Sequence, residues 1–257
     1  MALAVLFFER VASRKKLKYY ESIVGIVLFS LIYVVYSYIF ELNGLINLQR
    51  VDISLIAIDR WILGSDLFIF SNSYTSIWLT EILQVSYFLF FFLMLWQGLY
   101  LIFTRKVDKL VEFTRIIIFG FYFSYIGYVF FPAIGPRFTL LDFSSIDTLL
   151  PGLLLTDTIR EIINGAANIT AVSKAHLDVN EDCIPSGHTM LTLINVYFAF
   201  LNRIPIRWPL AIISSLIIVS TMYMHYHYLI DVILGVICAI IALIIEPKIA
   251  NRLKKVA

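Results

Sequence analysis

The chain has 257 residues, of which 60% are apolar and only 15% charged, and its formal net charge is +2. Soluble domains carry roughly 25% charged and 45–50% apolar residues, so this composition excludes an ordinary soluble domain. The small charge, with no basic patch among the aromatic residues, excludes a nucleic-acid partner, and no protein partner is implied.

The first 20 residues are predicted to be a cytoplasmic interfacial segment. Their apolar stretch precedes the basic cluster, the reverse of a secretory signal, and no small-residue cleavage site follows. We expect one catalytic membrane domain over residues 21–248 and a cytoplasmic tail over residues 249–257.

Membrane-spanning helices need about 20 largely apolar residues. Six segments meet this condition: Ser22–Phe40, Ile77–Phe103, Arg115–Phe131, Pro185–Leu201, Leu210–Tyr226 and Leu229–Ile245. The sequence therefore predicts an all-α, polytopic membrane protein with six transmembrane helices. The last two segments are nearly contiguous, which predicts a tight helical hairpin.

The distribution of basic residues predicts the orientation, because cytoplasmic loops are enriched in Lys and Arg. With the N-terminus inside, 15 of the 20 basic residues lie on the inner side. The five on the outer side are Arg50, Arg60, Arg137, Arg160 and Lys174. Both termini are therefore predicted to be cytoplasmic.

The long connections fall on the outer side. Residues 41–76 contain DISLIAIDRWILG, whose apolar residues recur at helical spacing among charges, as in a helix lying in the membrane interface. Residues 132–184 are mostly polar and are predicted to form an outer loop.

Three polar clusters lie at the predicted outer ends of spans. They are FFPAIGPRF at the end of the third span, EDCIPSGHT at the start of the fourth, and STMYMHYHYLIDV between the last two. Ionisable residues at membrane depth are costly and are candidates for function. The sequence therefore predicts an active site on the outer, extracytoplasmic face (periplasmic, extracellular or luminal).

The first two clusters suit an anion. A helix that begins at PSGHT presents free backbone N–H groups and a positive dipole end. Gly187 allows close approach of a phosphate, and Ser186 adds a hydroxyl donor. Arg137 offers a planar cation for phosphate oxygens. These three residues are the predicted phosphate-binding residues.

The third cluster suits a nucleophile. His227 and Asp231 are spaced i, i+4 and share one face if a helix has already begun. Asp231 would then keep one imidazole nitrogen protonated and leave the other free to attack phosphorus. His188 is suited to protonate the leaving alkoxide. A structural His227–Asp231 pair is the alternative reading.

Several polar residues are candidates for a supporting role. Glu81 and Gln84 lie near the outer end of the second span and either line the site or pair with another span. Asp182 is a loop cap or a partner of the catalytic groups, and His225 is a candidate substrate contact. Cys183 is predicted to be incidental. Together, Asp182, His188, His227 and Asp231 are an alternative metal site, although we expect none.

Two motifs resemble the type 2 phosphatidic acid phosphatase superfamily, which also contains the vanadium haloperoxidases. One is PSGH at residues 185–188, and the other is Ser220 followed seven residues later by the histidine of HxxxD. The resemblance covers about residues 75–245. It implies a six-helix core, cofactor-free and metal-independent chemistry on a lipid phosphate, His227 as the nucleophile that forms a phosphohistidine, Asp231 as its orienting partner and His188 as the general acid.

The chain departs from the family pattern at its cations. Phe130 stands where the first motif has Lys, Thr221 stands where the third has Arg, and Arg137 follows Pro136 instead of preceding a proline. GPRF, the carboxylate four residues before the serine of SGHT, and HYLIDV resemble the sphingomyelin synthase and inositol phosphorylceramide synthase branch.

These departures leave two functions open. The first is a lipid phosphate phosphatase, and the alternative is a phosphotransferase that moves phospholipid head groups. Arg160 and Lys174 are candidates to replace the missing cations, and a site with fewer cations favours a singly charged phosphodiester.

Overall fold

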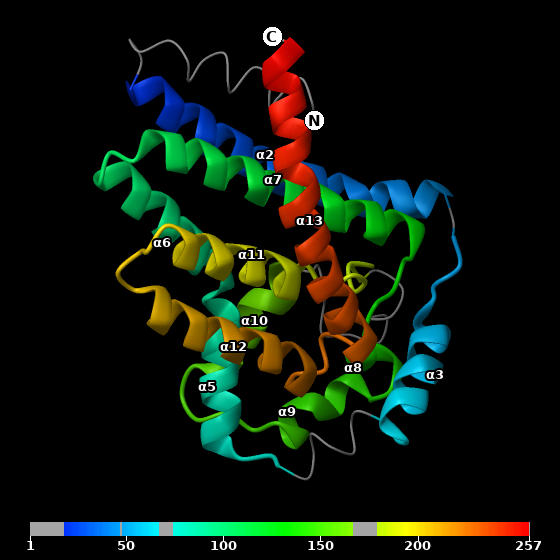
Figure 1. Ribbon diagram of the computed structural model, residues 1–257. Helices are drawn as coiled ribbons and strands as arrows, with labels where there is room; N and C mark the ends of the chain where they lie inside the picture. Colours follow the sequence, from blue (N-terminus) through cyan, green and yellow to red (C-terminus); the bar gives the residue numbers. More distant parts are fainter. Residues whose placement is uncertain (1–17, 47, 67–73, 167–178, 257) are drawn as a thin grey trace.

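The computed structural model describes residues 18–46, 48–66, 74–166 and 179–256, and most of these residues are helical (Figure 1). The helices are α2 (Lys18–Ile46), α3 (Asp52–Leu63), α5 (Ile77–Phe88), α6 (Phe90–Phe103), α7 (Val107–Phe130), α8 (Pro136–Thr139), the 3₁₀ turn η1 (Phe143–Ser145), α9 (Ile146–Leu149), α10 (Thr156–Ala166), α11 (Gly187–Leu201), α12 (Arg207–Tyr223) and α13 (Leu229–Val256). These ranges contain no strand, which confirms the all-α class. Most of the predicted interfacial segment, residues 1–17, lies outside them, and α13 continues through the predicted tail to Val256.

The apolar helices make this a membrane-embedded protein. In the described part of the chain, Val107–Phe130 and Leu229–Arg252 are long and apolar enough to cross a bilayer, and α5 with α6 is a third candidate if the pair counts as one span bent by 47°. Three further helical stretches, Ser30–Ile46, α11 and α12, are apolar but shorter. At 1.5 Å per residue, the 15 residues of α11 extend only about 22 Å, less than the hydrocarbon thickness of about 30 Å.

The predicted second span, residues 77–103, is broken rather than continuous. It divides between Phe88 and Phe90 into α5 and α6. Just before the break, the Ser86 hydroxyl donates to the Ile82 carbonyl at 2.7 Å. Such a bond to the carbonyl four residues back commonly bends a helix. A side-chain bond of this kind acts only locally and does not alter the apolar pattern of the segment. The pattern therefore did not predict this break.

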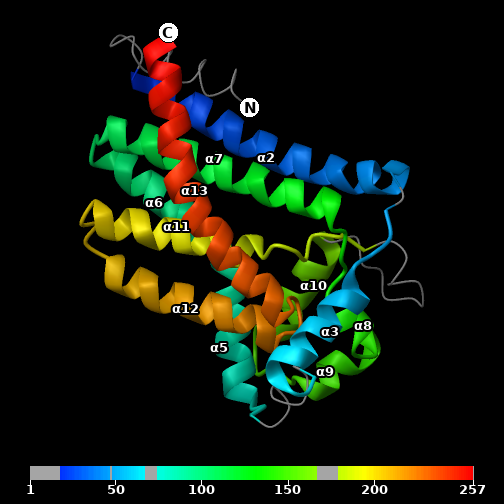
Figure 2. The ribbon, with the colours of Figure 1, turned by 45° about the vertical axis from the view of Figure 1, so that its right-hand side comes forward.

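Helices α2, α6, α7, α11 and α12 run roughly alongside one another, while α13 crosses them (Figure 2). The start of α2, the α6–α7 connection and the α11–α12 connection lie at one end, while α3, α8 and α9 lie at the other. The connections at the first end carry several of the basic residues that were predicted to be cytoplasmic.

The predicted hairpin between the last two spans is wrong. Helix α12 packs against α5 and α11, whereas α13 packs against α11 and α7, and α12 and α13 do not pack along each other. Residues 224–228 separate the two helices. This connection includes His225, whose φ of 59° is in the left-handed region. The turn sends α13 away from α12 and leaves the connection free to carry polar side chains.

Two glycines bring α7 and α13 close to the start of α11. A Cβ added at Gly127 of α7 would lie 2.2 Å from Cδ of Pro185, and one added at Gly235 of α13 would lie 2.7 Å from the Ser186 carbonyl oxygen. Small residues at such contacts let helices approach closely, which is how membrane helices gain packing energy. The start of α11 is therefore held between α7 and α13.

Candidate active site

The three polar clusters of the sequence meet in the structure. Backbone hydrogen bonds join them in pairs: Cys183 N–H to the Ala133 carbonyl at 3.2 Å, Ser186 N–H to the Asp231 carbonyl at 3.0 Å, and Arg137 N–H to the His225 carbonyl at 2.9 Å. Each pair links two different clusters. Residues 45 to 88 positions apart in the chain are therefore joined into one unit at the start of α11 and α13.

The start of α11 has the geometry of a capped helix. Ser186 is the N-cap, and its buried hydroxyl oxygen accepts from the Thr189 N–H at 3.2 Å and from the Thr189 hydroxyl at 3.0 Å. Gly187 is the first helical residue, and a Cβ there would lie 2.5 Å from the Tyr128 hydroxyl. The close contact with Tyr128 of α7 thus favours glycine at position 187, whatever approaches the helix end.

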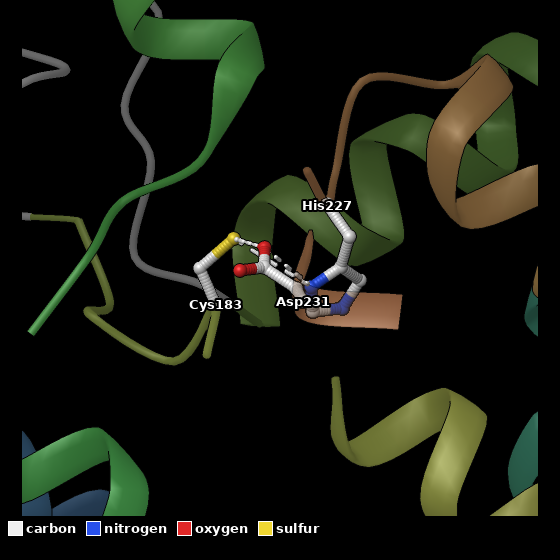
Figure 3. A group of neighbouring side chains, drawn as sticks. All are labelled: Cys183, His227 and Asp231. Atoms are coloured by element: carbon white, nitrogen blue, oxygen red, sulfur yellow. Dashed lines mark hydrogen bonds and ion pairs between the residues drawn. The ribbon is translucent and has the colours of Figure 1, made fainter. Parts of the chain in front are cut away.

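Figure 3 shows Cys183, His227 and Asp231 facing one another. His227 Nδ1 lies 3.6 Å from Asp231 Oδ2, and all three side chains are buried. Asp231 Oδ2 also accepts from the Cys183 thiol at 2.8 Å and from the Tyr228 N–H at 2.9 Å. The carboxylate is therefore fixed by two donors while it faces the imidazole.

The predicted reason for the His227–Asp231 contact was a shared helix face, and this reason is wrong. Helix α13 begins at Leu229, so His227 lies in the connection before it. The N–H groups of both Tyr226 and His227 bond to the Thr221 carbonyl, at 2.9 and 3.0 Å. This tight turn, rather than helical periodicity, brings His227 to Asp231.

Cys183 was predicted to be incidental but contacts the central carboxylate. Burial raises the pKa of its thiol well above the ordinary value, and the charge of Asp231 raises it further. The thiol therefore stays protonated and donates to Asp231. The position of Cys183 in the same polar cluster as Ser186 was the sequence feature that could have identified it as a site residue. Sγ, a carboxylate oxygen of Asp231 and an imidazole nitrogen of His227 all lie within 4.8 Å of one another, so these three are the described residues able to ligate a metal together.

His188 also lies close to His227. The two imidazole centroids are 5.7 Å apart and the ring planes are inclined at 62°, so the two rings are close enough to contact one phosphate group. Tyr87 stacks on His188 at 4.6 Å, and Phe90 contacts it at 4.4 Å. These two residues flank the break between α5 and α6. The bend of the second span therefore shapes the environment of His188.

Arg137 lines a small pocket of about 40 Å³ beside this group. The pocket is lined by Arg137, Phe143, Ile146, Asp147, Arg160, Asn164, Met224 and Tyr226. The guanidinium carbon of Arg137 lies 4.7 Å from the centre of the Tyr226 ring, and Nη1 donates to Asn164 at 3.2 Å. Tyr226 in turn stacks on Tyr87 at 4.5 Å. Arg137 and the imidazoles are thus neighbours across Tyr226 and Tyr87 and do not touch.

A second arginine reaches the same pocket. Arg160 of α10 is buried, and it donates to the Asp147 carboxylate at 2.9 Å and to the Leu150 carbonyl at 2.6 Å. Asn164, the partner of Arg137, lies one turn further along the same helix. Lys174, the other cation proposed from the sequence, lies outside the described residues.

The positions of the missing motif cations face elsewhere. Phe130 at the end of α7 is 65% exposed, while Thr221 is fully buried and its hydroxyl donates to the Ile218 carbonyl at 2.7 Å. Neither lines the pocket that Arg137 and Arg160 share.

Of the supporting candidates, Glu81 and Asp182 have partners away from the imidazoles. Glu81 accepts from four backbone N–H groups and the Thr156 hydroxyl at the start of α10. Asp182 accepts a short hydrogen bond from Tyr36 of α2. Glu81 therefore holds the helix that carries Arg160, and Asp182 ties the second cluster to α2.

The other two candidates are buried. Gln84 is fully inaccessible on α5. His225 is also inaccessible, and burial lowers the pKa of its imidazole to about 4. A neutral His225 supplies no charge to the site, and its backbone carbonyl is the group that holds Arg137.

Two carboxylates of α3 belong to this unit, and the sequence reading missed both. Asp52 accepts from residues of the first cluster and from Tyr228, and Asp59 accepts from the first two N–H groups of α13. Their spacing of seven residues places them on one face of the helix. This spacing was the sequence feature that could have identified them as a pair.

The comparison with known families agrees with the motifs. The chain matches the PAP2 superfamily over residues 53–245, a range that contains all three clusters and α3 from Ile53 onward. No curated protein and no solved structure matches the chain. The matched range covers well over half of the chain, so this membrane-embedded protein belongs to the PAP2 superfamily, the type 2 phosphatidic acid phosphatases and their relatives.

Proposed function

We propose that the protein is a lipid phosphate phosphatase that forms a phosphohistidine on His227. The observation that carries the proposal is the proximity of three groups: Asp231 Oδ2 lies 3.6 Å from Nδ1 of His227, and the ring centroid of His188 lies 5.7 Å from that of His227. A carboxylate on Nδ1 favours the tautomer in which Nε2 is the free nucleophile. PAP2 superfamily members are phosphatases and phosphotransferases, which supports an enzyme acting on lipid phosphates.

The reaction has two steps. In the first, His227 Nε2 attacks phosphorus, the bond from phosphorus to the lipid oxygen breaks, and His188 gives its proton to that oxygen. In the second, neutral His188 takes a proton from water, whose oxygen attacks the phosphohistidine, and the N–P bond breaks to release inorganic phosphate. Asp231 stabilises the positive charge of the imidazole in both steps. Arg137, Ser186 and the Gly187 N–H would bind the phosphate oxygens.

A head-group phosphotransferase is the second candidate, and the charge of the pocket supports it. Arg160 is already paired with Asp147, so Arg137 is the one cation of the pocket without a carboxylate partner among the described residues. One such cation matches a monoanionic phosphodiester better than a dianionic monoester. In that reaction a lipid hydroxyl replaces water in the second step.

One assay separates the two reactions. The purified protein is incubated with phosphatidic acid and with a phospholipid panel, each with and without ceramide or diacylglycerol. Free phosphate and new head-group lipids are measured in the same samples. Phosphate release from phosphatidic acid that is independent of an acceptor supports hydrolysis, whereas a new lipid that requires ceramide or diacylglycerol supports transfer.

For the membrane arrangement, we propose six spans with both termini in the cytoplasm and the site on the extracytoplasmic side. The excess of basic residues on one side supports this orientation. A cysteine at Leu154, which is 79% exposed, should react with an impermeant maleimide in intact cells. A cysteine at exposed Pro205 should react only after permeabilisation. The reverse pattern, measured against the parent chain, would overturn the orientation and the location of the site.

Activity is expected to persist in EDTA and to be inhibited by vanadate. Vanadate adopts the five-coordinate geometry of phosphoryl transfer, and the proposed anion site consists of Arg137, Ser186 and a backbone N–H. Turnover is measured before and after dialysis against chelator. A loss of activity that a divalent ion restores would instead support a metal held by Cys183, His227 and Asp231.

A further inference from the structure

Helix α3 has an unusual distribution of side chains, because its buried face carries charges and its exposed face is apolar. The carboxylates Asp52 and Asp59 are only 4% and 3% exposed. On the outward side, Ile53 and Trp61 are 83% and 85% exposed, and Ile58 and Ile62 are also exposed. A helix on the surface of a soluble protein has the opposite polarity.

The buried carboxylates each hold a different part of the candidate active site. Asp52 accepts from the Ile134 N–H at 3.2 Å, the Gly135 N–H at 3.0 Å and the Tyr228 hydroxyl at 2.8 Å. The first two donors lie three and two residues before Arg137 in the chain, and the third directly follows His227. Asp52 therefore joins the arginine loop to the histidine loop.

Asp59 caps the helix that carries Asp231. It accepts from the Leu229 N–H at 2.7 Å and from the Ile230 N–H at 2.9 Å, which are the first two residues of α13. Burial raises the pKa of its carboxyl. Burying a carboxylate is costly unless donors compensate it, and both of these donors to Asp59 belong to α13.

The exposed face of α3 fits the surface of a bilayer. Ile53, Ala57 and Trp61 form a stripe at i, i+4 and i+8, and tryptophan is enriched at the membrane–water interface. Arg60, at the edge of this face, pairs with Asp66 and is itself suited to the head-group level. The helix lies with α8 and α9 at one end of the bundle (Figure 2).

We infer that α3 is an interfacial positioning helix, whose apolar face lies in the lipid surface while Asp52 and Asp59 hold the loops of Arg137, His227 and Asp231 in register. Contact with lipid fixes the position of the helix, and the hydrogen bonds of the two carboxylates in turn fix the position of the loops that form the site. The consequence for turnover rests on the proposed function, whereas the restraint on the loops does not.

Hydrogen exchange of the protein in phosphatidylcholine nanodiscs tests the restraint. Asp59→Asn places an amide NH₂ or a weaker acceptor against two N–H donors, so the amides of residues 227–231 should exchange at least about threefold faster. Asp52→Asn should do the same for residues 133–137. Asp66→Asn removes the same charge from the same segment and should leave both peptides unchanged. Equal exchange in all three variants would overturn the proposal, and this readout needs no activity.

Tryptophan fluorescence tests the lipid contact. In a variant that retains only Trp61, emission should be quenched by phosphatidylcholine brominated near the head-group end of its chains. If that variant does not fold, the emission removed by Trp61→Phe gives the same information. Quenching by aqueous iodide with none by the brominated lipid would overturn the interfacial placement. In the activity assay, Asp59→Asn should lower kcat by about tenfold with little change in KM, unlike Asp66→Asn.

Discussion

His227→Gln is expected to lower turnover by about 10⁴-fold or more, because no other described residue is placed to carry the phosphoryl group in the proposed reaction. Asp231→Asn should cost about 10²–10⁴-fold, since it disturbs the tautomer and orientation of the imidazole and leaves the nucleophile in place. Rates are measured with purified protein in bilayers. Quenching with sodium dodecyl sulfate at alkaline pH, where the N–P bond of a phosphohistidine is stable, should trap a labelled phosphoenzyme in the parent and none in His227→Gln.

His188→Gln provides the matched comparison, because it is the same substitution in the neighbouring imidazole. Its loss should depend on the leaving group. A lipid alkoxide needs the proton of His188, whereas a nitrophenolate leaves without one, so a nitrophenyl ester should still form the phosphoenzyme. If His227→Gln retained near-normal rates while His188→Gln did not, the assigned roles would be reversed.

The meeting of the three clusters could be expected from the sequence, because each sits at the end of an apolar segment and helix ends share a membrane face. The chemistry proposed for His227, His188 and Asp231 rests on their residue types and motifs. Their local geometry did not. The spacing of His227 and Asp231 predicted a shared helix face, but a turn closed on the Thr221 carbonyl brings them together. Backbone hydrogen bonds of this kind have no residue signature.

The roles of Glu81, Asp52 and Asp59 depend on long-range contacts, and periodicity identifies a helix face without saying what covers it. The sequence of α3 predicted its helix and its apolar stripe correctly. It did not show that the charged face would be the buried one, since the donors that compensate Asp52 and Asp59 come from residues 134–135 and 228–230. The prediction of an α12–α13 hairpin was wrong for a related reason. A short connection brings the ends of two helices together, but it does not determine whether the helices pack along each other.

The proposed role of Arg137 makes its loss the second large effect. The side chain has no carboxylate partner among the described residues and rests on the Tyr226 and Phe138 rings, so its charge stays available to a substrate anion. Arg137→Gln should lower kcat/KM by about 10²–10³-fold. Arg137→Lys should recover only part of this, because lysine lacks the planar fork. Arg207→Gln, which removes an arginine lying over the Phe200 ring at the far end of α12, is the matched control and should have little effect.

Variants of the other charged residues in this pocket discriminate between the two proposed substrates, since removing a cation harms a dianionic group more than a monoanionic one. If the native substrate is a monoester, Arg160→Gln should lower monoester turnover more than diester turnover, and Asp147→Asn should shift the ratio the other way. The shift from Asp147 should be small, because that side chain is 76% exposed and water screens its charge. If the native substrate is a diester, Arg137 alone should dominate and Arg160→Gln should change both rates alike. Brisk monoester turnover in the parent that is indifferent to both arginines would defeat the charge argument, because the dianion would then be stabilised by groups other than the cations of this pocket.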